Sequence, residues 1–211
     1  MGSSGRREME RLRELLGGVD VYLLDQVMKG RIPAGSRVLD VGCGGGRNIE
    51  LFLRCGYDVW AVDVEQRAAR ATFALARELG AGRPVGWTSR QDAAALAFRG
   101  ASFDVVVCSA LLHFCPDRER FAASVEEMWR VLAPHGLLFV RLASTAGIED
   151  RLESLGGGRY RLPGGQEWLL VDRPQLLDWT ERLGGRLIEP IKTTVVDDLR
   201  AMTTWCLVKR G

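Results

Sequence analysis

The sequence predicts an α/β fold built on a doubly wound, mostly parallel sheet. Two observations lead to this prediction. Short apolar runs alternate with helical segments along most of the chain, and a glycine-rich turn follows the first apolar run. Strands that alternate with helices form parallel sheets with helices on both faces. The turn indicates where such a sheet would bind a ligand.

Composition indicates one domain over residues 1–211, because 211 residues with 46% apolar content can form a single sizeable core. The net charge of +2, without blocks of like charge, argues against a dedicated nucleic-acid binder. No apolar stretch reaches the roughly 18–20 residues of a membrane-spanning helix, and the polar start does not read as a signal peptide. We therefore expect a cytoplasmic protein without a membrane partner.

The five cysteines are scattered and form no C-x-x-C pair. Reduced thiols in the cytoplasm fit this pattern better than disulfides or structural zinc. With only two histidines in the chain, we expect no metal site.

The N-terminal segment, residues 6–28, is predicted to be helical with an interruption at Gly17 and Gly18. An apolar stripe of leucines and a valine favours packing against the edge of the sheet. Its members are Leu12, Leu15, Leu16, Val19, Leu23 and Leu24.

Five apolar runs are predicted to be strands, and their continuous apolar character is typical of parallel strands buried on both faces. They are residues 37–41, 59–62, 85–88, 103–108 and 137–142. Helices are predicted between them at residues 48–54, 66–79 and 118–132. Gly56 and Gly80 end the first two helices, as C-terminal glycines do, and the Pro-His-Gly sequence at 134–136 ends the third.

Residues 143–170 interrupt this alternation with two glycine-rich stretches. They predict a long irregular segment, which in a compact domain is either functional or disordered. A helix near residues 175–183 and strands at 186–195 and 203–209 follow. The domain thus divides into a helical cap (1–30), a cofactor-binding core (31–142), an insert that caps the substrate (143–170) and a C-terminal part with the last helix and the edge strands (171–211).

The glycine-rich turn at residues 40–46 reads Asp-Val-Gly-Cys-Gly-Gly-Gly and joins a strand to a helix. This is the layout of a nucleotide-type cofactor site. Arg47 stands where a dinucleotide fingerprint has its third glycine, and Asp40 precedes the first glycine by two residues. A carboxylate suits a cationic ligand better than a pyrophosphate. S-adenosylmethionine has an ammonium group, a sulfonium and no phosphate.

Residues 38–46 resemble motif I of the class I S-adenosylmethionine-dependent methyltransferases, and the likeness extends over roughly residues 37–142. Residues 46–48 and 56–63 resemble the tellurite-resistance-type, small-molecule branch. The resemblance implies a Rossmann-like, seven-stranded sheet with an antiparallel edge strand, S-adenosyl-L-methionine as cofactor and a small-molecule methyl acceptor. The resemblance to this branch implies a metalloid or thiol-like acceptor. The sequence does not determine the acceptor atom or the oligomeric state.

The cofactor-binding residues are expected at the carboxyl ends of the strands. Gly42 and Gly44, with Cys43 between them, let the backbone approach the ligand without a Cβ in the way. The resemblance implies that Asp40 contacts the methionyl ammonium.

Asp63 ends the second strand, 21 residues after Gly42. Its carboxylate can accept hydrogen bonds from both ribose hydroxyls, or it can cap the helix that follows. Val64 would pack on the adenine or ribose.

Two further parts of the cofactor site come from the resemblance. Asp92 is expected to accept a hydrogen bond from the adenine amino group, with the amide of Ala93 on a ring nitrogen; the alternative is an aspartate in a turn. Ser109 and Ala110 leave the fourth strand beside the cofactor, where their small size leaves room for the methyl group.

Methyl transfer is an in-line displacement that depends mainly on alignment, so no catalytic triad is expected. His113 is the candidate general base; the alternative is a histidine that packs on the cofactor or a neighbouring loop. Cys108 and Cys115 read as inert packing. For an anionic or aromatic acceptor the candidates are Arg141, Arg159, Tyr160, Arg161 and Trp168, of which the arginines could equally be solvated.

Three alternatives remain beside a small-molecule methyltransferase. Asp40 and the missing third glycine argue against a nicotinamide-dependent oxidoreductase. A methyltransferase acting on RNA, DNA or protein is disfavoured because Ser-Ala-Leu-Leu at 109–112 replaces the Asn/Asp-Pro-Pro-Tyr signature of nucleic-acid amino methylation. A catalytically silent cofactor-binding domain shares the fold, because fold does not fix function.

Overall fold

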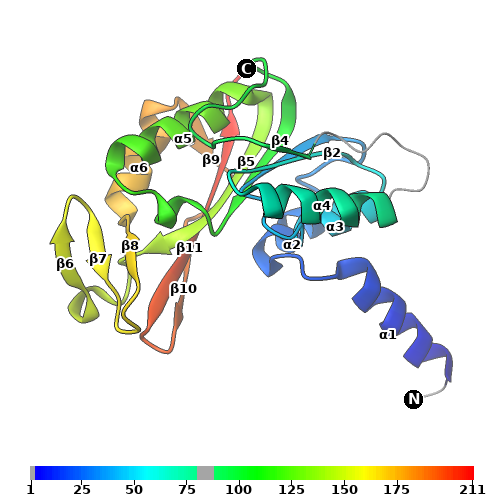
Figure 1. Cartoon of the computed structure of the whole chain (residues 1–211), viewed down its shortest axis with the longest axis horizontal. Helices are drawn as coiled ribbons and strands as arrows, with labels where there is room; N and C mark the ends of the chain where they lie inside the picture. The colour runs from blue at the N-terminus through cyan, green and yellow to red at the C-terminus, as the bar shows by residue number, and fades with distance from the viewer. Residues whose placement is uncertain (1–2, 80–87) are drawn as a thin grey trace.

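The computed structural model describes residues 3–79 and 88–211 and is drawn in Figure 1. Its main sheet has the strand order β10-β11-β5-β4-β1-β2-β3, and an eighth strand, β9, also pairs with β11. The strands are β1 (Arg37–Val41), β2 (Asp58–Asp63), β3 (Thr88–Arg90), β4 (Phe103–Ser109), β5 (Leu132–Ser144), β9 (Gly185–Leu187), β10 (Lys192–Val196) and β11 (Arg200–Lys209). All neighbours from β5 to β3 are parallel, and β11 is antiparallel to its partners. The doubly wound fold is confirmed.

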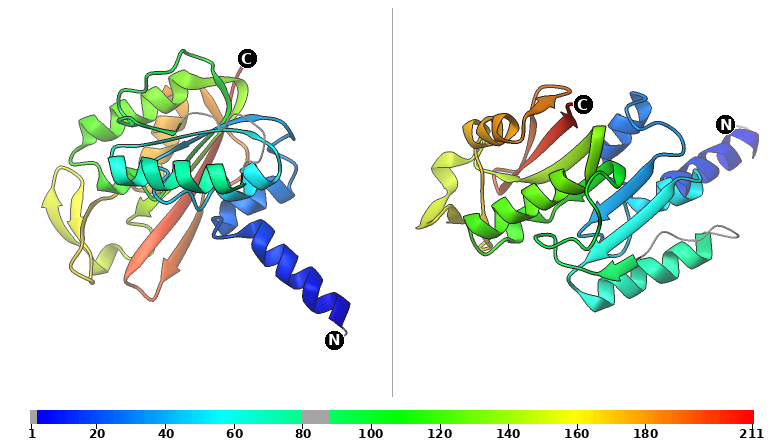
Figure 2. Two further views of the ribbon diagram at one scale, coloured as in Figure 1. Left: turned by 45° about the vertical axis from the view of Figure 1, so that its right-hand side comes forward. Right: turned by 90° about the horizontal axis from the view of Figure 1, so that it is seen from above.

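Helices cover both faces of this sheet, as Figure 2 shows. They are α1 (Ser3–Leu16), α2 (Val21–Met28), α3 (Ile49–Arg54), α4 (Gln66–Leu79), α5 (Arg118–Val131) and α6 (Arg173–Arg182), with short 3-10 helices η1 (Leu112–Phe114) and η2 (Glu149–Arg151). Alternate strand residues face opposite sides. Leu39 and Val41 join the core under α5 and α6, whereas Val38 joins the core under α2 and α3. No helix in the described parts of the chain is long and apolar enough to cross a membrane.

Two strand boundaries differ from the prediction. β5 begins at Leu132, because residues 132 and 137 pair with residues 103 and 105 of β4 and the intervening Pro-His-Gly sequence forms a bulge instead of a turn. His135 has a φ of +64° in this bulge. The third predicted strand, residues 85–88, falls almost wholly outside the described residues, as does Gly80, and β3 is described from Thr88.

The predicted strand at residues 186–195 is two strands, β9 and β10, and this makes the number of strands eight instead of seven. Both pair with β11, on either side of a break that contains Pro190. A proline has no amide hydrogen to donate to the ladder, so pairing stops there.

The prediction of an irregular insert is wrong. After β5, the chain forms a second, antiparallel sheet from β6 (Glu153–Gly156), β7 (Arg159–Arg161) and β8 (Glu167–Leu169). The three glycines at 156–158, all with positive φ, make the turn between β6 and β7. We call this three-stranded unit the cap sheet. It lies beyond the carboxyl end of β5 in Figure 1.

The helical N-terminal segment is confirmed as α1 and α2, separated at Gly17 and Gly18. The expected packing of the apolar stripe on the sheet edge is wrong for α1, which extends away from the body of the molecule and leaves Leu12 and Leu15 exposed, whereas α2 lies against the sheet (Figure 1).

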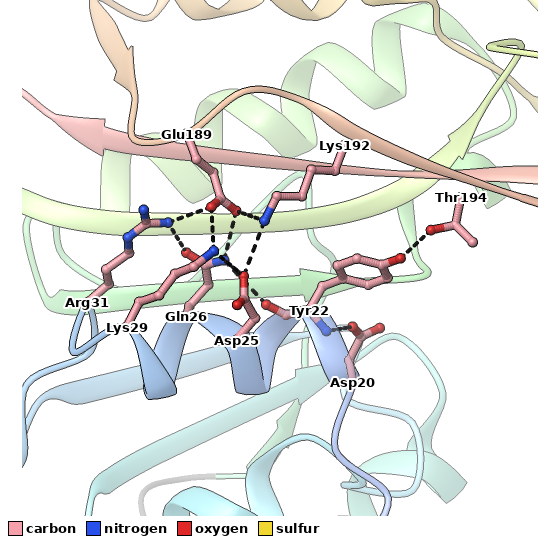
Figure 3. Close-up of polar contacts among 9 residues, drawn as sticks. All are labelled: Asp20, Tyr22, Asp25, Gln26, Lys29, Arg31, Glu189, Lys192 and Thr194. Carbon is pink, nitrogen blue, oxygen red and sulfur yellow. Dashed lines mark hydrogen bonds and ion pairs between the residues drawn. The ribbon is translucent and has the colours of Figure 1, made fainter.

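Polar contacts to Glu189, shown in Figure 3, hold α2 in place. The side chain of Glu189 is 8% exposed and accepts hydrogen bonds from Lys29 and Arg31 at 2.8 Å and from Gln26 at 2.9 Å. Lys192 of β10 pairs with it at 3.0 Å. Burial by itself raises the pKa of Glu189, but these donors outweigh it and lower the pKa from 4.5 to about 2. Glu189 therefore joins α2 to the C-terminal strands as a charged group.

We expect Glu189→Gln to lower the free energy of unfolding near pH 7 by about 1.5–3 kcal/mol, as for other hydrogen bonds to charged groups. Because the folded pKa lies below the unfolded one, this contribution is present above pH 4.5 and is lost as the pH falls toward 2. Urea unfolding at several pH values should show the difference from wild type shrinking as the pH falls. Exposed Glu126, replaced by Gln, is the matched control, and equal losses for both variants would contradict this role.

Candidate functional site

A cleft of about 210 Å³ opens at the carboxyl ends of β1 and β2. Five of the residues predicted to bind the cofactor line it: Gly42, Asp63, Val64, Asp92 and Ala93. Its remaining lining residues are Val41, Gln91, Leu111, Phe114, Cys115, Pro116, Arg120 and Ser124. The structure thus brings together motifs that are up to about 50 residues apart, as expected where parallel strands end at a common edge.

The glycine turn needs glycine at two positions for different reasons. Gly42 has a φ of +76°, and a Cβ on it would lie 2.9 Å from the Leu111 side chain. Gly44 has a φ of +53°, and a Cβ there would meet nothing within 4 Å. The first glycine permits close packing, and the second leaves open space above the turn into which a ligand can approach the backbone.

Asp40 lies on the central strand β1, where it pairs in register with Ala61 and Val107, and it is 1% exposed. Neither carboxylate oxygen has a hydrogen-bond partner among the described residues. Burial raises the pKa of Asp40 to about 7, nearby Asp63 adds to the rise, and Arg47 opposes it. A buried carboxyl without a partner is costly. A cationic ligand that donates hydrogen bonds would supply what this group lacks.

Asp63 braces the glycine turn. One carboxylate oxygen accepts from the amide of Gly44 and the other from the amide of Glu65, both at 2.9 Å. The bond from Glu65 stabilises the turn that leads into α4, which begins at Gln66, so Asp63 accepts no hydrogen bond from an amide of the described helix itself. A carboxylate offers about four acceptor positions, so two remain for ribose hydroxyls. Val64 is 50% exposed at the wall of the cleft.

Asp92 also has local partners. Its carboxylate accepts from the amide of Ala94 at 2.9 Å and forms an ion pair with Arg120 of α5. The turn alternative for Asp92 is thus present, while Asp92 and Ala93 both reach the cleft. Arg120 had no sequence signal that distinguished it from other helical arginines.

Ser109 and Ala110 end β4 at this edge. Ser109 is 7% exposed, donates to Asp20 at 3.2 Å and accepts from Arg47 at 3.3 Å. Ala110 has a φ of +61° and packs toward the apolar cluster beneath the cap sheet. A non-glycine residue in the left-handed region costs roughly 1–2 kcal/mol, and such strain is concentrated at functional sites.

His113 is 3% exposed, and its ring packs 4.3 Å from that of Phe114 and 4.6 Å from that of Trp168. The amide of Ala143 donates to Nδ1 at 3.3 Å. Burial lowers the pKa of His113 to about 4. A neutral imidazole that accepts at Nδ1 carries its proton on Nε2 and can only donate there. General-base catalysis by His113 stays a prediction, and this geometry weighs against it.

The buried cysteines near the cleft are poor nucleophiles. Burial raises the pKa of Cys43 to about 12, and it also raises the pKa of Cys108 and Cys115. For Cys108 and Cys115, this agrees with their interpretation as inert packing.

Of the predicted acceptor-binding arginines, only Arg141 lies at this edge of the main sheet. Arg161 pairs with Glu153 and Glu167 within the cap sheet, and Arg159 donates to backbone carbonyls. Sequence reasoning missed Asp20, the N-cap of α2, which is 4% exposed and binds Ser109 and Arg141. Its position just after Gly17 and Gly18, at the start of an apolar helix, was the available signal.

The fold and the position of the cleft are those of a doubly wound domain that binds a ligand at the carboxyl ends of its strands, and comparisons with known proteins show what this chain is similar to. A family model described as "Methyltransferase domain" matches residues 39–140. The chain is 37% identical over 118 residues to a ubiquinone biosynthesis O-methyltransferase of Xylella fastidiosa (strain 9a5c), covering 56% of this chain and 46% of that protein. A protein of the same name from Caulobacter sp. (strain K31) is 30% identical over 152 residues, 70% of this chain and 58% of the relative. The chain thus spans about half the length of these relatives.

Solved structures show the same fold. A methyltransferase from Methanosarcina mazei superposes with a TM-score of 0.71 at 20% identity, covering 87% of this chain and 97% of that one. The 1,6-didemethyltoxoflavin-N1-methyltransferase of Burkholderia thailandensis, solved with S-adenosylhomocysteine, gives 0.68 at 17% identity, covering 99% and 84%. The chain therefore resembles class I S-adenosylmethionine-dependent methyltransferases in sequence over residues 39–140 and shares the fold of solved members. Its likeness to the tellurite-resistance-type branch stays a prediction.

The unusual His113 can be tested directly, because the chain has only two histidines. We expect ring nitrogen NMR to show the Nε2–H tautomer for His113 and a titration midpoint near pH 4. His113→Gln would assign its signals. A midpoint near 6.5, or a proton on Nδ1, would contradict the described geometry.

Asp40→Asn should separate stability from binding. The folded pKa of Asp40 lies above the unfolded value of 3.8, so its cost to stability is absent at pH 3 and grows as the pH rises through about 7. We expect the variant to be more stable than wild type at pH 8 and no more stable at low pH. It should bind S-adenosylhomocysteine about 10–150-fold more weakly, since a charged hydrogen bond contributes about 1.5–3 kcal/mol.

The control for this pair of measurements is Asp58→Asn, which changes an exposed acid at the opposite end of β2. Unfolding at pH 8 and pH 4 with calorimetric titration gives both readouts. If Asp40→Asn matches this control in affinity, Asp40 does not face the ligand.

Proposed function

We propose that this chain is a methyltransferase that transfers a methyl group from S-adenosylmethionine to a small-molecule acceptor. The observation that carries the proposal is the buried carboxylate of Asp40, which has no partner among the described residues and stands two residues before a glycine turn with open space at Gly44. The names of the ubiquinone biosynthesis relatives support a small acceptor. The part that matches this chain covers 46% of the first of these proteins.

The residues would hold the cofactor in four places. Asp40 would receive the methionyl ammonium, the turn at Gly42 and Gly44 would lie along the ligand, Asp63 would bind the ribose hydroxyls, and Asp92 with Ala93 would meet the adenine. When bound, S-adenosylmethionine supplies an electrophilic methyl group on a good leaving group. The protein's part is then alignment and exclusion of water.

Small side chains at the end of β4 suit this role. Ser109 ends β4 and Ala110 packs against the apolar cluster beneath the cap sheet, so their small size would leave space for the methyl group. The strained backbone at Ala110 is held by a hydrogen bond from its amide to the carbonyl of Arg141 at 2.7 Å. This bond fixes the tip of β4 to β5 at the point where alignment matters.

The ribose assignment can be tested with Asp63→Ala. We expect it to weaken S-adenosylhomocysteine binding by more than about 1 kcal/mol, because it leaves ribose hydroxyls unpaired in a partly buried site. The 2′-deoxy analogue of S-adenosylhomocysteine distinguishes the loss of a hydrogen bond to the ribose from a loosened glycine turn, because only the first depends on the hydroxyl. Wild type should discriminate between the two ligands, and Asp63→Ala should not.

NADH, titrated in parallel, tests the oxidoreductase alternative. Binding of NADH without S-adenosylhomocysteine would overturn the proposed function. If Asp63→Ala still binds S-adenosylhomocysteine more tightly than the 2′-deoxy analogue, then Asp63 does not bind the ribose.

A further inference from the structure

A polar row crosses the α2-covered face of the sheet at its carboxyl end. Ser109 of β4 pairs in register with Arg141 of β5, and Arg141 pairs with Thr204 of β11. By alternation, these side chains share the face of Phe139 and Cys206, which pack in the core under α2. Asp20, at the start of α2, contacts this row through hydrogen bonds from Ser109 and Arg141.

Arg141 is the central member of the row, and its hydrogen bonding is incomplete. Its side chain is 18% exposed, and Nη1 donates to Oδ2 of Asp20 at 3.2 Å. The guanidinium lies over the Tyr22 ring, 5.1 Å from the centroid. Nε is buried and has no acceptor among the described residues. Asp20 therefore satisfies only part of a donor set that can hold a carboxylate through two parallel bonds.

Charge at this point is unbalanced as well. The same oxygen of Asp20 that binds Arg141 lies 3.8 Å from Nη2 of Arg47 and accepts from Ser109. Two guanidinium groups thus converge on one carboxylate oxygen. Asp40 is only partly ionised near neutral pH, because burial raises its pKa to about 7. The net charge of this group of side chains is therefore positive, which favours an anionic ligand.

The next residues on this face are apolar. Ala143 and Met202 follow Arg141 and Thr204 by one alternation and form a cluster with Leu162 and Leu170. Tyr160 and Trp168 of the cap sheet pack against this cluster, as does Ala110 at the tip of β4. Arg141 therefore lies between the expected methyl position and an apolar, aromatic surface.

We propose that Arg141 binds a carboxylate group of the methyl acceptor, and that Asp20 occupies this position when the acceptor is absent. The proposal rests on the proposed function for the identity of the ligand as an acceptor. A planar carboxylate can pair with two nitrogens of Arg141, whereas Asp20 pairs with one. Asp20 is tied to α2, where it also caps the helix by accepting from the amide of Tyr22. Entry of the acceptor exchanges this internal carboxylate for an external one.

The test compares 3-phenylpropanoate with its uncharged amide, each titrated into the full chain saturated with S-adenosylhomocysteine and followed by ligand-observed NMR. We expect wild type to prefer the acid by about fivefold or more, and Arg141→Gln to lose this preference. Asp20→Asn keeps a good helix cap but removes the competing charge, so it should bind the acid more tightly. Arg37→Gln, which removes the same charge at the opposite end of the sheet, is the matched control and should behave as wild type.

Three results would overturn the proposal: equal binding of acid and amide by wild type, no binding of the acid by any variant, or an unchanged affinity for the acid in Asp20→Asn. If Arg141→Gln does not fold, Arg141→Lys replaces it, and this variant should keep the sign of the preference but reduce its size because a lysine cannot form two parallel bonds.

The cofactor also has a carboxylate, so a second experiment must show whether Arg141 binds the carboxylate of the acceptor or that of the cofactor. Arg141→Gln should bind S-adenosylhomocysteine within about threefold of wild type. If it loses that ligand by tenfold yet retains 5′-methylthioadenosine, which lacks the carboxylate, then Arg141 binds the cofactor and the proposal is wrong. Failure of wild type to bind S-adenosylhomocysteine contradicts the proposed function alone, since the acid and amide can still be compared without it.

Discussion

The desolvation of Asp40 is the constraint on which the site depends. The central strand of a parallel sheet is covered on both faces, so a carboxyl group on β1 loses its water and, without a partner, its ionised form is disfavoured. None of the residues that the structure describes donates a hydrogen bond to this carboxyl, and Arg47 relieves the cost only in part, through its charge. Asp40 therefore lowers the stability of the protein when no ligand is bound, and a cationic ligand would supply its missing partner. Functional sites commonly reduce stability in this way.

The rest of the site is arranged around this carboxyl. Gly42 brings the turn close over Leu111, and Asp63 holds the turn through the amide of Gly44. α2 closes the other side through Asp20, and Glu189 fixes α2 to the C-terminal strands. Contacts far apart in the sequence therefore meet at one edge of the sheet. This is how a chain of this size brings the cleft and the apolar cluster beneath the cap sheet to the same edge.

Much of this arrangement follows from local sequence. Buried parallel strands are apolar throughout, so β1 and β4 were predicted nearly to the residue, and α4 was predicted with its observed bounds. Five of the residues predicted to bind the cofactor line the cleft because they stand at or just after the ends of strands. The cap sheet was missed because its strands are three or four residues long and largely exposed, which leaves no apolar alternation to detect. Asp20 and Glu189 were missed because their importance comes from partners more than 85 residues away.

The most direct test of this account is the number of protons exchanged when S-adenosylhomocysteine binds. An ammonium group that pairs with Asp40 requires the ionised carboxylate, so near pH 7 the account predicts proton release on binding, measured by calorimetry in buffers of different ionisation enthalpy. The release should vanish in Asp40→Asn. Tight binding to wild type without proton release would contradict the central role given to Asp40.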